Sequence, residues 1–317
     1  MSFFKKTIFW VMVLAVIAGA FIVFTKEEEK FERKKEESVR LFRFEPDDVT
    51  DISFKKGDRI IECKNDGKGW YILKPVRADA DKEVFERFFK MVVKGKIDAV
   101  LFENQPKDRL SEFGLDKPYL EVSFKLKNEK KPKSIFFGDR GPTQNVAFAI
   151  TSDDSRVFRL HADVRAEADK DVYDLRDKTI LPFEPTKAKG VAIIRGDKKI
   201  VMEQPSEGMW HLTEPFEGIV NVAKLMEILY KVKNSKAQAF IEEDPKDLKK
   251  YGLDKPIIKL NVWSGDANPP QVLLIGDKSK NPRGIYAKRE SIANVFLLEE
   301  EFTDIFPEDA KNMVEKQ

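Results

Sequence analysis

One phrase occurs twice in this 317-residue chain, and it constrains the fold more than any other feature. EFGLDKP at 112–118 returns as KYGLDKP at 250–256, each time with an aromatic residue before the glycine. Other short matches follow in the same order at offsets of 138 to 140: FEP at 44–46 and 183–185, WYILKP at 70–75 and WHLTEP at 210–215, IFFGD at 135–139 and LLIGD at 273–277. Two copies are too few for a solenoid, so the sequence predicts two homologous domains in tandem.

Each copy alternates short apolar runs with turn residues, which predicts antiparallel strands. The first copy offers DISF, RIIEC and GWYIL as a three-stranded meander, then YLEVSFKL, SIFFG, VAFAI and RVFRL. Between them the apolar spacing becomes helical, and Asp81 and Asn221 are the expected N-caps of this helix. The predicted helical stripes are Val84, Phe85, Phe88, Phe89, Val92 and Val93 in one copy and Val222, Leu225, Met226, Leu229 and Tyr230 in the other.

The recurring residues are interpreted as structural. Gly114 and Gly252 are expected to end a short helix, opened by a proline, in the left-handed conformation. A ligand-binding role for Asp116 and Asp254 is the alternative. The Gly-Asp pairs at 138–139 and 276–277 are expected to end a strand in a turn, with a shared ligand surface as the alternative. Two tryptophans are expected as core anchors, with sugar stacking as the alternative. The full set of repeat-motif residues is Trp70, Pro75, Gly114, Leu115, Asp116, Pro118, Gly138, Asp139, Trp210, Pro215, Gly252, Leu253, Asp254, Pro256, Gly276 and Asp277.

An uncharged apolar segment at 7–24, TIFWVMVLAVIAGAFIVF, predicts a membrane anchor. As a helix it would extend about 27 Å, close to the thickness of a bilayer core. The AGA at 18–20 leaves a cleaved signal peptide as an alternative. The short tail before the segment favours an extracytoplasmic body, whereas the Lys/Arg count after it favours the opposite orientation.

The predicted class is α+β: an N-terminal transmembrane helix followed by two homologous, mainly antiparallel-sheet domains, each with one main helix and a short helix. The charged segment KEEEKFERKKEESVR is expected to form a solvated stalk, because it has few apolar residues. The predicted divisions are 1–25 as anchor, 26–43 as stalk, 44–175 as first repeat, 176–306 as second repeat and 307–317 as tail.

The sequence contains no recognisable catalytic or cofactor-binding motif. The 57 basic and 55 acidic residues nearly cancel, so no basic field for nucleic acid is expected. Neither His161 nor His211 belongs to a metal-binding pattern, and both are expected to serve surface or packing roles. A single cysteine, Cys63, excludes an internal disulfide and is expected in the core. We therefore predict no catalytic residues, no cofactor and no metal.

The landmarks W…L..P, FGLDKP, FFGD and LRDKTILPF (175–183), followed by a second round, resemble bacterial domain-of-unknown-function family number 4340. The resemblance covers about residues 44–306. It implies a single-span envelope protein with an extracytoplasmic body, encoded beside ABC-transporter components of the gliding-motility type. No catalytic residues are established for the family, so the resemblance assigns none to this chain.

Three functions follow as expectations. The first is a non-enzymatic accessory or scaffold protein, anchored in the cytoplasmic membrane, with a transporter subunit or auxiliary membrane protein as its partner. The second is an extracytoplasmic ligand-binding module with a site between the two repeats. The third, a hydrolase, would need two carboxylates in one cleft.

Overall fold

The computed structural model describes residues 21, 24–27, 39–106, 108–141, 144–265 and 269–315. The chain divides into two compact units between Arg176 and Asp177. Almost all of the predicted anchor at 7–24, and residues 28–38 of the predicted stalk, lie outside the described residues. Among those that are described, no helix has the length and apolar content needed to cross a membrane.

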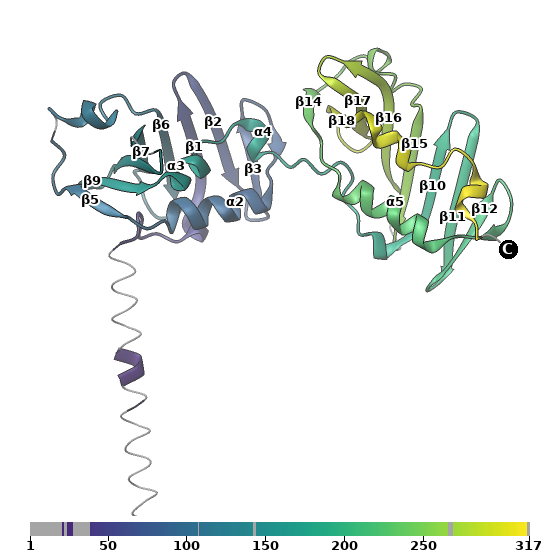
Figure 1. Ribbon diagram of the computed structural model, residues 1–317, viewed down its shortest axis with the longest axis horizontal. Coiled ribbons are helices and arrows are strands. Elements are labelled where there is room, and N and C mark those ends of the chain that lie inside the picture. The colour runs from purple at the N-terminus through teal and green to yellow at the C-terminus, as the bar shows by residue number, and fades with distance from the viewer. Residues whose placement is uncertain are drawn as a thin grey trace, which may run out of the picture. The chain divides into compact units, whose positions relative to one another are not determined.

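The first unit consists of one sheet and a few short helices (Figure 1). Its strands are β1 (Val49–Lys56), β2 (Arg59–Asn65), β3 (Trp70–Lys74), β4 (Ala78–Asp79), β5 (Ala99–Phe102), β6 (Leu120–Leu126), β7 (Lys133–Arg140), β8 (Val146–Thr151) and β9 (Asp154–His161). Its helical segments are η1 (Pro46–Asp48), α2 (Lys82–Phe88), η2 (Phe89–Val93), η3 (Leu110–Phe113), α3 (Ala162–Ala168) and α4 (Val172–Leu175).

The second unit repeats this order of elements. Its strands are β10 (Ala188–Arg195), β11 (Lys198–Ser206), β12 (Met209–Glu214), β13 (Gly218–Ile219), β14 (Ala239–Glu242), β15 (Ile258–Ser264), β16 (Gln271–Lys280), β17 (Arg283–Arg289) and β18 (Val295–Leu298). Its helical segments are η4 (Pro185–Lys187), α5 (Val222–Asn234), η5 (Lys249–Tyr251), η6 (Glu300–Ile305) and η7 (Ala310–Met313).

The two sheets have the same strand order, which confirms the predicted duplication. Over the described residues, each unit holds one nine-stranded sheet, and the paired strands are antiparallel. The orders are β4-β3-β2-β1-β6-β7-β8-β9-β5 and β13-β12-β11-β10-β15-β16-β17-β18-β14. The short strands β4, β5, β13 and β14 were not predicted, because two to four residues are too few to show an alternating pattern.

The main helix of the first unit follows its sequence pattern closely. Asp81 caps α2 by accepting hydrogen bonds from the backbone N–H groups of Glu83 and Val84. The helix continues into a π-helical turn, η2, so the two segments bury one continuous stripe against the sheet. All six residues of the predicted stripe are buried: Val84, Phe85, Phe88, Phe89, Val92 and Val93.

The stripe of α5 differs from its prediction. Asn221 caps this helix as predicted, accepting from the Lys224 backbone N–H. Val222 and Tyr230, however, are 36% and 44% exposed. The buried face is formed by Leu225, Ile228, Leu229 and Val232. This set keeps the regular three-and-four spacing, which places Val222 and Tyr230 on the flanks of the helix.

Both units extend beyond the limits predicted for the repeats. Leu41 and Phe42, expected in the stalk, are buried in the core of the first unit, and the Leu41 backbone N–H donates to the Gly95 carbonyl. Ala310 and Met313, expected in a tail, are buried in the core of the second unit. Apolar residues are sparse in both segments, so their core role was not evident from composition.

Candidate functional site

The repeated Gly-Leu-Asp and Gly-Asp phrases meet within each unit. In the first unit Gly114 follows η3 with a φ of 63°, and the Leu115 backbone N–H donates back to the Leu110 carbonyl. Leu115 is buried. These features confirm the predicted left-handed helix end. The helix begins at Leu110, however, and not at the proline of the phrase, whose carbonyl accepts a hydrogen bond from the Arg109 backbone N–H ahead of the helix.

The second half of the motif is a close packing contact. A Cβ on Gly138 would lie 2.0 Å from the carbonyl oxygen of Phe113, so only glycine fits there without displacing the backbone. The prediction that Gly138 and Asp139 end a strand in a turn is wrong. Strand β7 continues through both residues with an irregular register between Phe137 and Arg140, and this irregularity accommodates the loop.

The second unit repeats this contact. Gly252 has a φ of 66°, and a Cβ on Gly276 would lie 2.1 Å from the Tyr251 carbonyl oxygen. Strand β16 likewise runs through Gly276 and Asp277, so the turn predicted for this pair is also wrong. Leu253 is buried, as the sequence predicted.

The four motif aspartates lie at the surface. Asp116, Asp139, Asp254 and Asp277 are exposed, as is Pro118, whereas Pro256 is half-buried. The carboxyl carbon of Asp139 would lie 2.6 Å from a Cβ on Gly114. Over the described residues, no group of three or more His, Cys, Asp and Glu side chains is placed to hold a metal ion.

Of the two motif tryptophans, Trp70 packs on the main helix of its unit and Trp210 lies in the core of its unit. The Trp70 ring stacks on Phe85 with 5.0 Å between centroids and an interplanar angle of 16°. Trp210 is 2% exposed within the core of the second unit. The exposed prolines Pro75 and Pro215 follow these two strands. A stacked or fully buried indole leaves little surface on which a sugar ring could stack.

The two histidines lie at the surface, whereas the single cysteine lies in the core of the first unit. His161 is an exposed N-cap of α3, accepting from the Asp163 backbone N–H through Nδ1, and His211 is exposed on β12. Cys63 is 1% exposed, and burial raises the pKa of its thiol to about 12. Within the first unit, Cys63 lies in the core and His161 at the surface, so these two side chains do not form a nucleophilic pair.

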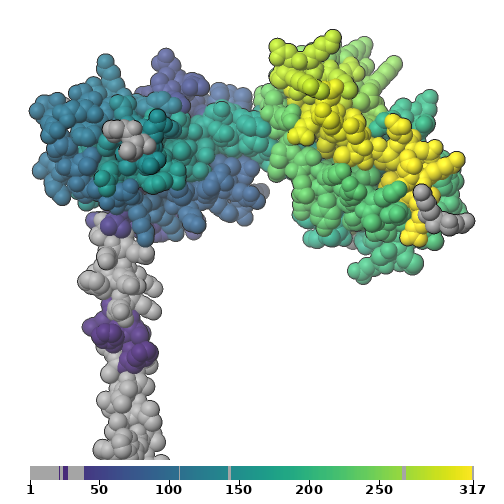
Figure 2. Space-filling view, in the orientation of Figure 1, coloured from purple at the N-terminus to yellow at the C-terminus, as the bar shows by residue number. Residues whose placement is uncertain are grey.

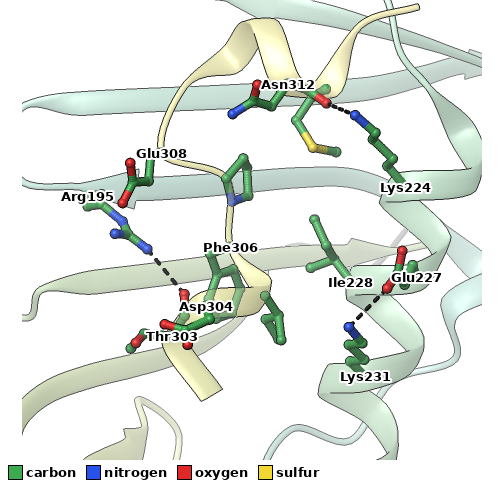
Figure 3. A pocket seen from close by; sticks show the side chains of 13 residues that line it. Arg195, Lys224, Glu227, Ile228, Lys231, Thr303, Asp304, Phe306, Glu308 and Asn312 are labelled. Atoms are coloured by element: carbon green, nitrogen blue, oxygen red, sulfur yellow. Dashed lines mark hydrogen bonds and ion pairs between the residues drawn. The ribbon is translucent and has the colours of Figure 1, made fainter. Parts of the chain in front are cut away.

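A groove of about 590 Å³ in the second unit is the candidate binding site (Figure 3). One wall is α5, and the other is the segment 303–313, which lies beside that helix on the surface in Figure 2. The apolar part of the lining includes Ile228, Phe306 and Met313, all of which are buried. The charged lining residues are Arg195, Lys224, Glu227, Lys231, Asp304 and Glu308.

Each cation of the groove makes at least one polar contact, although the Arg195 Nε has no hydrogen-bond partner among the described residues. The Lys224 Nζ donates to the Asn312 carbonyl at 2.9 Å, and the Lys231 Nζ lies 2.9 Å from a Glu227 carboxylate oxygen. Arg195 donates to the Thr303 carbonyl at 3.2 Å through a terminal nitrogen. Asp304 and Glu308 are exposed and have no ion pair with any other described residue. Their carboxylates are therefore available to a ligand.

Comparison with the first unit shows one ion pair that has no equivalent at the groove. There, Arg87 on α2 pairs with Glu167 on α3 at 3.1 Å, and Lys170 adds a second contact to Glu167 at 3.2 Å. The equivalent positions, at the repeat offsets, are Glu227 and Ile305. A carboxylate and an isoleucine cannot form an ion pair, so this link is absent from the second unit, where the Lys224 Nζ joins helix and segment through the Asn312 carbonyl instead. This groove was not predicted from the sequence, because the prediction rested on residues that recur in both repeats, whereas the groove residues differ between the repeats.

The fold and the site define a tandem protein built from two copies of a helix-on-sheet unit. A family model described as Domain of unknown function (DUF4340) matches residues 70–217 and again residues 210–317. The chain belongs to this family. Both matches begin at an equivalent tryptophan, Trp70 or Trp210, on the third strand of its unit in chain order. Comparisons with curated proteins and with solved structures returned no match.

Proposed function

We propose that the chain is a non-enzymatic accessory or scaffold protein of the bacterial envelope, held in the cytoplasmic membrane by the segment 7–24 and associated with an ABC-type transporter. Its body lies on the extracytoplasmic side. The observation that carries this proposal is the combination of an apolar N-terminal segment with a duplicated body whose recurring residues pack against one another. Gly138 and Gly276 each allow a backbone carbonyl to approach closely, and Leu115 and Leu253 are buried, so these recurring residues stabilise the fold.

The groove of the second unit is the proposed contact surface for the transporter partner. It presents two free carboxylates, Asp304 and Glu308, above an apolar floor. Such a floor suits an apolar anchor side chain, and the carboxylates suit a basic residue beside it. The same groove supports the alternative function, an extracytoplasmic ligand-binding module, because a concave site with a few polar groups also suits small molecules.

Co-purification from solubilised membranes tests the partner. The full-length chain is expected to recover transporter subunits, and Asp304→Lys is expected to reduce that recovery by reversing a charge at the groove. Ala166→Lys is the matched control, since it introduces the same residue at the equivalent exposed position of the first unit. Recovery of no transporter subunit, or equal losses in both variants, would contradict the proposal.

Protease treatment of intact spheroplasts tests the side of the membrane. An extracytoplasmic body is digested without lysis, whereas a cytoplasmic body is digested only after lysis. Protection in intact spheroplasts would overturn the proposed orientation and would agree with the Lys/Arg count after the apolar segment.

A further inference from the structure

Two cations in the first unit lie against one tyrosine ring. The Lys56 Nζ is 4.4 Å from the centroid of the Tyr119 ring, and the Arg165 Cζ is 4.3 Å from it. Lys56, at the end of β1, also pairs with Asp169 at 2.7 Å. The Tyr119 hydroxyl donates to the other oxygen of that carboxylate at 2.9 Å. Each oxygen of the Asp169 carboxylate therefore already accepts one hydrogen bond, from Lys56 or from Tyr119.

Arg165 is left without an acceptor. The residue is 8% exposed on helix α3, and its Nε is shielded from solvent with no hydrogen-bond partner. It forms no ion pair with any other residue that the structure describes. Burial, followed by the positive charge of Arg140 on β7, lowers the pKa of Arg165, while interactions with Tyr119, Asp169 and Asp139 act in the opposite direction. Buried guanidinium groups are normally paired, because desolvating an unpaired charge is costly.

The charges around Arg165 indicate what could neutralise it. Lys56, Arg140 and Arg165 supply three positive charges, and Asp139 and Asp169 supply two negative ones. The remaining charge of about one unit matches a monoanion. Guanidinium groups bind carboxylates through two parallel N–H···O bonds, which a planar carboxylate accepts and a spherical ion does not.

The second unit lacks this arrangement. At the positions of Tyr119 and Arg165 it has Ile257 and Thr303, respectively. The equivalent of Arg140 is Lys278, which is paired with Glu300 at 2.8 Å. The stacked Tyr119–Arg165 pair is therefore specific to the first unit. Arg195 of the second unit also has a shielded Nε without a partner, but this arginine donates to the Thr303 carbonyl through a terminal nitrogen.

We propose that Arg165 and Arg140 form a binding site for a single carboxylate group. This inference does not depend on the transporter association, because it concerns a different unit and a different set of residues. The carboxylate can be carried by a small organic acid or by the C-terminus of a polypeptide. Arg165 supplies the shielded donor, and the exposed Arg140 closes the site over the bound group.

Nuclear magnetic resonance of the ¹⁵N-arginine-labelled full-length chain, in an uncharged detergent, tests the site. N-acetylglycine is the probe, N-acetylglycinamide the uncharged control, and sodium chloride the control for ionic strength. The Nε–H signal of Arg165 is expected to shift saturably with the acid alone. N-acetyltriglycine distinguishes the sources: an affinity equal to that of N-acetylglycine indicates a small acid, and tenfold tighter binding indicates a polypeptide terminus.

Variants decide whether the two arginines bind the probe. Arg140→Gln is expected to weaken binding about tenfold, or about 1.4 kcal/mol. Lys278→Gln, at the equivalent position of the second unit, is expected to have no effect. Arg165→Met is expected to abolish binding without lowering the melting temperature, because it removes an unpaired buried charge. Arg140 is exposed, so Arg140→Gln decides the matter even if Arg165→Met does not fold.

Three results would overturn the inference. One is the absence of a saturable Arg165 shift at about 0.1 M acid, well above the roughly millimolar affinity of a weak site. Another is an equal shift with the amide or with chloride. The third is tighter binding of inorganic phosphate than of the carboxylate, which would contradict the assigned ligand class.

Discussion

Replacing Gly138 by alanine tests whether the repeated Gly-Asp pair serves packing. The new Cβ would lie 2.0 Å from the Phe113 carbonyl oxygen and 3.0 Å from Leu115 side-chain atoms. A carbon–oxygen contact normally requires about 3.3 Å or more, so the loop must move by about 1 Å. Overpacking of this kind is expected to lower the free energy of unfolding by about 2–3 kcal/mol.

Gly57→Ala is the matched control in the same unit. Gly57 has a φ of 58° but nothing within 4 Å of the Cβ that alanine would add, so alanine there meets only the left-handed backbone penalty of about 1 kcal/mol. Gly276→Ala, where the Cβ would meet the Tyr251 carbonyl at 2.1 Å, should behave like Gly138→Ala in the second unit.

Native-state hydrogen exchange of the full-length chain, followed peptide by peptide, is the assay. It reports the stability of each unit separately, which a single denaturation curve of a two-unit chain does not. Peptides of β7 should lose protection in Gly138→Ala, and peptides of β16 should lose it in Gly276→Ala. If Gly138→Ala is no more destabilising than Gly57→Ala, the packing interpretation of the motif is wrong.

Three further predictions follow from single residues. Met313→Ala should lower the free energy of unfolding of the second unit by about 2–5 kcal/mol in hydrogen exchange, because Met313 is 2% exposed, and an unchanged value would place it outside the core. Cys63 should resist iodoacetamide at pH 8 in the folded chain and react in urea, because burial raises its pKa to about 12; rapid labelling of the folded chain would refute this. The contacts of Glu300 with Lys278 and Arg283 lower its pKa from 4.5 to about 2. Its stabilising contribution is therefore present above pH 4.5 and lost as pH falls towards 2, so Glu300→Gln should flatten the pH dependence of stability in that range, and an unaltered slope would contradict the assignment.

Periodicity and turn chemistry predicted the parts of the fold that depend on local sequence. The caps Asp81 and Asn221, and the left-handed glycines Gly114 and Gly252, each act through neighbours within a few residues. Such features are visible in a single stretch of chain.

Features that depend on distant segments were not predictable in the same way. Gly138 was assigned to a turn because the carbonyl that approaches it belongs to Phe113, on another element. Arg165 carried no sequence signal, since its importance comes from the missing acceptor and from the ring of Tyr119. Pairwise comparison of the two repeats, position by position, is the signal that could have indicated both the groove and this arginine.

The C-terminal segment of each unit also determines when that unit can finish folding during translation. Within the first unit, the Asp81 backbone N–H donates to the Leu175 carbonyl, and within the second the Asn221 N–H donates to the Met313 carbonyl. Each unit therefore forms this contact only after the final residues of its own repeat have left the ribosome. The earlier repeat can mature while the later one is still being translated, which keeps two similar sequences from exchanging strands during folding.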